Sequence, residues 1–124
     1  MLSLKVEIKK QNMEELNELE LTLLEGLTTN YPQLKSHIPY LKVVERKNTG
    51  TGLDVNFDYK DYSGELDDTN ALFSNEENIE IKGLKEGLSY VIDVTVGQIT
   101  SMEFSTYNEK WDGKFTDFKI VEKD

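Results

Sequence analysis

The side chains of this chain that could do chemistry are mostly carboxylates. Nine of them lie between Asp54 and Glu80, with Lys60 as the one base, so this segment carries −8 of the formal net charge of −10. Paired carboxylates can hydrolyse glycosides, and oxygen ligands suit calcium. With 24 acids in 124 residues, however, some pair will always lie at a usable distance. An EF-hand loop needs Asp at its first position and Gly at its sixth. With Gly64 at the sixth position the first is Tyr59, so only a looser, irregular calcium site stays open.

Other catalytic chemistries lack their residues. The chain has no cysteine, which removes disulfides, thiolate metal sites and thiol nucleophiles, and its one histidine, His37, cannot form a His-rich metal site. Gly50 and Gly52 are not followed by the Lys-Ser/Thr pair of a phosphate loop, and a hairpin turn accounts for them. We therefore expect no catalytic residue, no metal and no cofactor, and predict that the protein is not an enzyme.

The concentration of negative charge favours a protein partner. Such a patch repels phosphate and anionic lipid and accelerates encounters with basic surfaces, so we expect a basic protein surface, no nucleic acid and no membrane. The most concrete form of this hypothesis is an immunity-type or antitoxin-like inhibitor of a basic toxin. Tyr and Trp often anchor interfaces. The predicted partner-binding residues are Asp58, Asp61, Tyr62, Asp67, Asp68, Tyr107 and Trp111.

Two simpler interpretations of these residues stay open. The acidic segment could be a solvated loop that keeps the protein soluble, and Trp111 could cover a sheet edge or a corner of the core. A different function is also open, namely a small-ligand-binding domain with an apolar pocket between helix and sheet. Its lining residues would be Leu23, Leu27, Phe57, Tyr90 and Phe104.

The length of 124 residues predicts one domain, residues 1–124. No apolar stretch approaches the roughly 20 residues that span a bilayer, and the N-terminal residues mix charge into their apolar positions, unlike a signal peptide. Together with the absence of cysteine, this predicts a cytoplasmic protein.

Helical periodicity is confined to the N-terminal third. Asn12 and Glu15 have the spacing of a capping box, and a stripe of leucines follows at three- and four-residue intervals: Leu16, Leu19, Leu23, Leu24 and Leu27. A second, short helix begins at Pro32 and is expected to stop at Pro39. Residues 2–8 alternate like a half-buried strand, but could also be the first turns of a helix.

Alternation with period two follows, and it predicts strands over residues 41–46, 53–59, 79–81, 90–96 and 99–106 and through Phe118 and Ile120, with a short element at 71–73. Gly97-Gln98 has the form of a type II′ turn. The predicted fold is α+β, with one or two N-terminal helices packed on one face of an antiparallel meander of five or six strands. An exposed edge strand, either residues 79–82 or the C-terminal strand, could support a homodimer by edge-strand pairing.

Two stretches carry a resemblance. In residues 31–53 a Pro-led helix runs into a strand that ends with Arg46 and a Thr-Gly-x-Gly turn, and in residues 87–111 a Gly-led turn precedes a strand with a hydrophobic-Glu pair, an aromatic residue and a Trp. This pattern resembles a family of small bacterial proteins of uncharacterised function. The resemblance implies a bacterial α+β fold without assigned catalytic residues, a surface around Glu103 and Tyr107, and an ion pair between Arg46 and an acid of the sheet.

Overall fold

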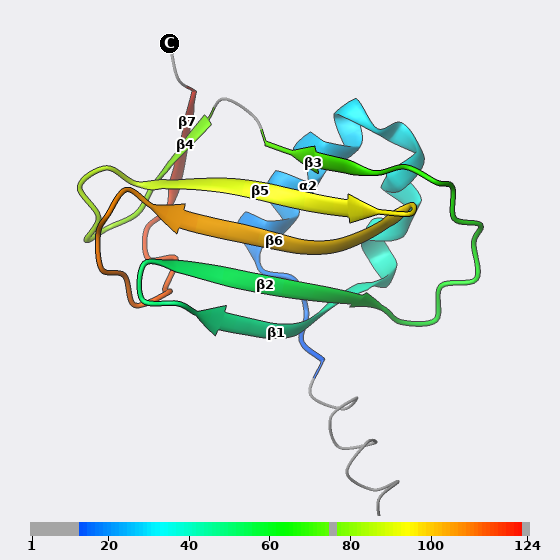
Figure 1. Cartoon of the computed structure of the whole chain (residues 1–124), viewed down its shortest axis with the longest axis horizontal. Coiled ribbons are helices and arrows are strands. Elements are labelled where there is room, and N and C mark those ends of the chain that lie inside the picture. Colours follow the sequence, from blue (N-terminus) through cyan, green and yellow to red (C-terminus); the bar gives the residue numbers. More distant parts are fainter. Residues whose placement is uncertain (1–12, 75–76, 123–124) are drawn as a thin grey trace, which may run out of the picture.

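The computed structural model describes residues 13–74 and 77–122. The elements follow one another as α2 (Glu18–Asn30), η1 (Pro32–Tyr40), β1 (Leu41–Asn48), β2 (Gly52–Tyr59), β3 (Ala71–Phe73), β4 (Glu77–Glu80), β5 (Leu88–Thr95), β6 (Gln98–Thr106) and β7 (Lys119–Glu122). Figure 1 shows both helices on one face of the sheet, and no helix of the described residues lies on the opposite face. The α+β class is confirmed, and the predicted element at residues 2–8 lies outside the described residues.

Helix α2 begins later than the sequence predicted. Asn17 is its N-cap: the Asn17 side chain accepts a hydrogen bond from the Glu20 amide (2.8 Å), and the Glu20 carboxylate accepts one from the Asn17 amide (2.8 Å). Glu15 does not take the predicted capping role, because the preceding backbone is extended and Glu14 exchanges two hydrogen bonds with Val43 of β1. The partner of the predicted box, Asn12, lies outside the described residues. The leucine stripe is confirmed for Leu19, Leu23, Leu24 and Leu27, which are buried, whereas Leu16 lies before the helix and is only partly buried.

The second helix is a 3₁₀ helix of nine residues, an unusual length for this conformation. Pro32 stands in its first turn, where a missing amide costs little, and Pro39 lies within the helix, which ends one residue later at Tyr40. Leu34 and His37 are its buried side chains. Together with α2 it forms the layer that covers the sheet.

The sheet is antiparallel and has seven strands rather than five or six, in the order β1-β2-β6-β5-β4-β7. The short strands β3 and β4 share the same edge of β5, because β3 pairs with its C-terminal half and β4 with Leu88. The predicted meander is wrong, since β2 pairs with β6 and not with the strand that follows it in sequence. Strand β4 is not an edge strand as one prediction had it, because β5 and β7 flank it; the C-terminal strand β7 ends the order at that side.

Two tight hairpins set the register of the sheet. The predicted β1–β2 hairpin is confirmed, and the Cβ of any larger residue at Gly52 would collide with the carbonyl oxygen of Phe104 on β6. The β5–β6 turn consists of Val96 and Gly97, with φ values of 48° and 76°. Positive φ at both central residues makes this a type I′ turn, not the predicted type II′ turn one residue later.

The core lies between the helices and the inner face of the sheet. Fully buried side chains come from every layer, among them Leu24 of α2, Leu34 of η1, and Val55, Ile92 and Met102 of the central strands. Side chains that alternate with these strand residues point to the helix-free face. Within the described residues, no helix is long and apolar enough to cross a membrane.

Candidate functional site

The acidic segment between β2 and β3 is fastened to the tip of the β5–β6 hairpin. The Gly97 amide donates to the carbonyl oxygen of Thr69 (2.8 Å), and the Val96 amide donates to the side chain of Asn70 (3.0 Å). Gly97 also lies so close to Asp67 that a Cβ at this position would collide with the Asp67 backbone. The segment therefore has a fixed path along one end of the sheet, on the right in Figure 1.

An aromatic cluster holds the start of this segment against η1. The ring centroid of Tyr62 lies 4.8 Å from that of His37, 5.4 Å from that of Tyr59 and 5.3 Å from that of Tyr40. The Tyr62 hydroxyl donates to the carbonyl oxygen of Glu65 (3.2 Å). Tyr62, a predicted anchor for a partner, is half-buried and supports the loop that carries the carboxylates.

Burial determines the protonation states within this cluster. The Tyr59 hydroxyl accepts a hydrogen bond from the Ile99 amide (2.9 Å) and lies 2.7 Å from His37 Nδ1. Burial raises the pKa of Tyr59 to about 12, although the Ile99 hydrogen bond opposes the rise. Burial also lowers the pKa of His37, against the opposing charge of Asp67. A neutral imidazole whose Nδ1 accepts from the Tyr59 hydroxyl satisfies all of these groups.

The predicted acids Asp58, Asp61, Asp67 and Asp68 are all exposed at this end of the sheet. The hydrogen bond from the Thr69 amide is the main cause that lowers the pKa of Asp67, so this carboxyl stays ionised. The three ion pairs among the described residues all use glutamates near the N-terminus, Glu14, Glu15 and Glu20. None of the described carboxylates between Asp54 and Glu80 is neutralised by an ion pair.

The helix-free face of the sheet adds further negative charge. Asp54 of β2 lies directly opposite Glu103 of β6, an arrangement of like charges that does not stabilise the sheet. Lys47 on the other side of Asp54 is the one base in this row. In the next row, Asn56 pairs with Ser101, which in turn pairs with Asp93 of β5. This face thus carries several carboxylates, with the apolar side chains of Val91 and Leu72 in the same two rows.

The other two predicted partner-binding residues lie at the opposite end of the sheet. Tyr107 and Trp111 follow β6, whereas Asp58 and Tyr62 lie where β2 ends, and the two strands are antiparallel. Eight residues of strand separate these ends by roughly 25 Å. Trp111 is only 7 % exposed, and its Nε1 donates to the carbonyl oxygen of Lys114 (3.1 Å). The structure thus agrees with the interpretation that Trp111 covers the core, and it does not bring the seven residues into one surface.

An ion pair that the sequence analysis missed connects the helices to the sheet edge. Glu20 is fully buried, and its two carboxylate oxygens accept hydrogen bonds from Arg46 Nε (2.9 Å) and Nη2 (2.8 Å). Arg46 also reaches Glu14 (2.7 Å). Its partners therefore come from the N-terminal segment and α2, not from the sheet as the resemblance implied. The sequence did contain a signal that Glu20 belongs to the helix cap, because Asn17 and Glu20 have the same spacing as Asn12 and Glu15, five residues later.

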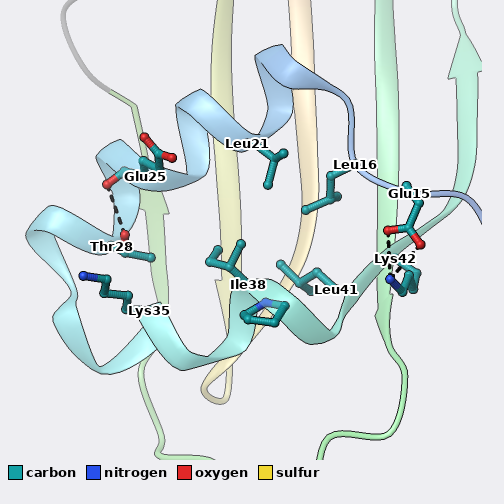
Figure 2. Close-up of a pocket in the computed structure, with 10 residues that line it drawn as sticks. Glu15, Leu16, Leu21, Glu25, Thr28, Lys35, Ile38, Leu41 and Lys42 are labelled. Atoms are coloured by element: carbon teal, nitrogen blue, oxygen red, sulfur yellow. Dashed lines mark hydrogen bonds and ion pairs between the residues drawn. The ribbon is translucent and has the colours of Figure 1, made fainter.

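An apolar groove lies away from the residues that the sequence analysis assigned to a pocket. The predicted lining residues are packed within the core: Leu23, Leu27, Phe57, Tyr90 and Phe104. A groove of about 370 Å³ instead lies between α2 and η1, where Leu16, Leu21, Ile38 and Leu41 point toward one another (Figure 2). The Glu15–Lys42 ion pair closes one end of this groove, and Glu25, Thr28 and Lys35 border the other.

Two further findings bear on function. Within residues 13–74 and 77–122, no three His, Asp or Glu side chains gather as they would around a metal ion. No protein-family model, curated protein or solved structure matches the chain. The functional inference therefore depends on the chemistry of the surfaces described above.

Proposed function

We propose that the protein is a non-enzymatic binding module whose acidic surface docks on a basic protein, as an immunity- or antitoxin-type inhibitor would. The observation that supports this most directly is the set of exposed carboxylates without ion pairs at one end of the sheet. Unneutralised charge of one sign attracts an oppositely charged surface over several ångströms and raises the rate of encounter. The proposed steering residues are Asp58, Asp61, Asp67 and Asp68.

The way the acidic segment is fastened adds to this argument. Hydrogen bonds from Val96 and Gly97 and the packing of Tyr62 on His37 already hold the segment in place. A partner would meet charges in fixed positions, so little conformational entropy would be lost on binding.

The test is capture of a partner by the tagged protein from a lysate of its native cells, at low and at high salt. We expect one stoichiometric, basic protein that is retained at low salt and released at high salt. The variant D58N/D61N/D67N/D68N should lose it, while Asn keeps the side-chain oxygen that Tyr59 and Thr69 contact through their amides. E18Q/E25Q/E86Q/E122Q changes the net charge equally on other surfaces and should retain the partner. Solitary wild-type protein at both salt concentrations would contradict the proposal.

A second candidate function is supported by the groove between α2 and η1. Its volume of about 370 Å³ and its leucine and isoleucine walls suit a small apolar ligand. An anilinonaphthalene sulfonate dye should then bind the native protein with increased fluorescence. L21E, which places a charge in the groove, should abolish the signal, whereas L72E, at an exposed leucine outside the groove, should leave it unchanged. No dye binding by native wild-type protein would remove this candidate.

A further inference from the structure

The most exposed apolar side chains of the described residues lie together at the acidic end of the sheet. Leu72 of β3 is 74 % exposed and Val96 of the β5–β6 turn is 58 % exposed, more than any other large hydrophobic side chain described. Leu72 pairs with Asp93 of β5, and the Val96 amide is bonded to Asn70, two residues before Leu72. The two residues therefore lie on neighbouring segments at the same corner of the sheet, and we call the surface that carries them the hairpin-tip patch.

The hairpin-tip patch and the residues around it are arranged like a protein–protein interface. An open hollow of about 360 Å³ adjoins Leu72, with Asn70, Ala71, Asp93 and Thr95 along its border. Asp93 lies opposite Leu72 in the β3–β5 pairing, Asp67 lies against Gly97 next to Val96, and its neighbour Asp68 is exposed; none of these carboxylates forms an ion pair with a described residue. An apolar centre within a polar, charged rim is the usual anatomy of a protein–protein interface.

The residue in the turn adds a second argument. Positions with positive φ in a type I′ turn favour Gly, Asn or Asp, whereas a β-branched residue is disfavoured there. Val96 nevertheless occupies such a position, at φ 48°, and more than half of its side chain is exposed. The core and the turn would therefore be served equally well by Asn at this position. What Val96 adds is exposed apolar surface.

We propose that the hairpin-tip patch is the anchor of the binding surface, and that it receives an apolar side chain flanked by lysines or arginines on the partner protein. This inference deepens the proposed function and depends on it. The rim carboxylates would pair with the basic residues, while Leu72 and Val96 would be desolvated by the apolar one. The anchor role that the sequence assigned to Trp111 thus passes to Leu72 and Val96, because Trp111 is buried at the other end of the sheet.

Two synthetic peptides of equal length and charge test the proposal. One alternates Lys with Leu and the other alternates Lys with Ser, and each is titrated into the ¹⁵N-labelled full chain. We expect the Lys/Leu peptide to bind about tenfold more tightly, which corresponds to about 1.4 kcal/mol. We also expect it to shift the amide signals of Leu72 and Val96 most.

The variant L72T/V96N should bind both peptides with equal affinity. Thr suits a strand and Asn suits the turn, so both substitutions fit their backbones, and the amide spectrum reports whether the fold is kept. V44T is the matched control, because Val44 is also exposed (44 %) but lies on β1; it should keep the tenfold difference.

The outcomes separate this inference from the proposed function. Equal affinity of wild type for the two peptides, or an unchanged preference in L72T/V96N, would overturn the role of the patch while leaving a basic partner in place. Binding of neither peptide at low salt would overturn the proposed function and the patch with it.

Discussion

Removal of the Arg46 guanidinium should destabilise the protein more than any other single change to a charged side chain at the β1 edge. Glu20 is fully buried, and two of its three hydrogen bonds come from Arg46. In R46M this carboxylate would be left in the core with only the Asn17 amide as a donor. Removing one partner of a buried ion pair costs about 3–5 kcal/mol. Because 24 % of the Arg46 side chain is exposed and water can partly replace it, we expect a loss of about 3 kcal/mol.

The assay is urea unfolding at pH 7, followed by circular dichroism. Lys47 is the matched control, because it is exposed on the same strand, and K47M should change the free energy of unfolding by no more than about 0.5 kcal/mol. The double variant E20M/R46M should recover much of the loss, with a coupling energy of about 2 kcal/mol, since it leaves no unpaired buried charge. A loss in R46M no larger than that in K47M would refute the reasoning.

Further predictions concern the aromatic cluster and the β5–β6 turn at the acidic end of the sheet. Because burial lowers the native pKa of His37, its stabilising contribution is present above about pH 6.5 and is lost as pH falls through the native pKa. The difference in unfolding free energy between wild type and H37Q should therefore change below pH 6.5, and parallel curves would contradict this. Tyr59 should ionise at about pH 12 in an ultraviolet phenolate titration, and its contribution to stability should be lost as pH rises through that value. The variant Y59F should cost about 1–3 kcal/mol in urea unfolding, since it leaves the buried Ile99 amide unpaired; a loss below 0.5 kcal/mol would argue against that hydrogen bond. V96N should raise the free energy of unfolding by about 1 kcal/mol, because Asn tolerates the positive φ that Val does not, and a decrease would count against the type I′ turn.

Local patterns predicted the elements of this fold well where tertiary contacts did not compete. The leucine spacing identified the buried face of α2, and the alternation from Leu53 to Tyr59 identified β2. The start of α2 was misplaced because both Asn12 and Asn17 are followed by Glu three residues later. The choice between them depends on the pairing of Glu14 with Val43, a contact between residues far apart in sequence.

The arrangement of the candidate site could not be predicted in the same way. It depends on β2 pairing with β6, which sends the segments after these two strands to opposite ends of the sheet. Tyr107 and Trp111 are separated from Tyr62 and the acids for this reason. The exposure of Val96 was equally hidden, because its apolar side chain suggested a continuation of strand β5 and not a turn.

The most direct test of the central claim is the association rate with the captured partner as a function of ionic strength. Wild-type protein should associate fast at low salt and lose that advantage as salt rises. D58N/D61N/D67N/D68N should associate about tenfold more slowly at low salt and show a weaker salt dependence, whereas E18Q/E25Q/E86Q/E122Q should behave like wild type. An association rate that is the same for wild type and the first variant at every salt concentration would contradict the claim that this acidic surface meets a basic partner.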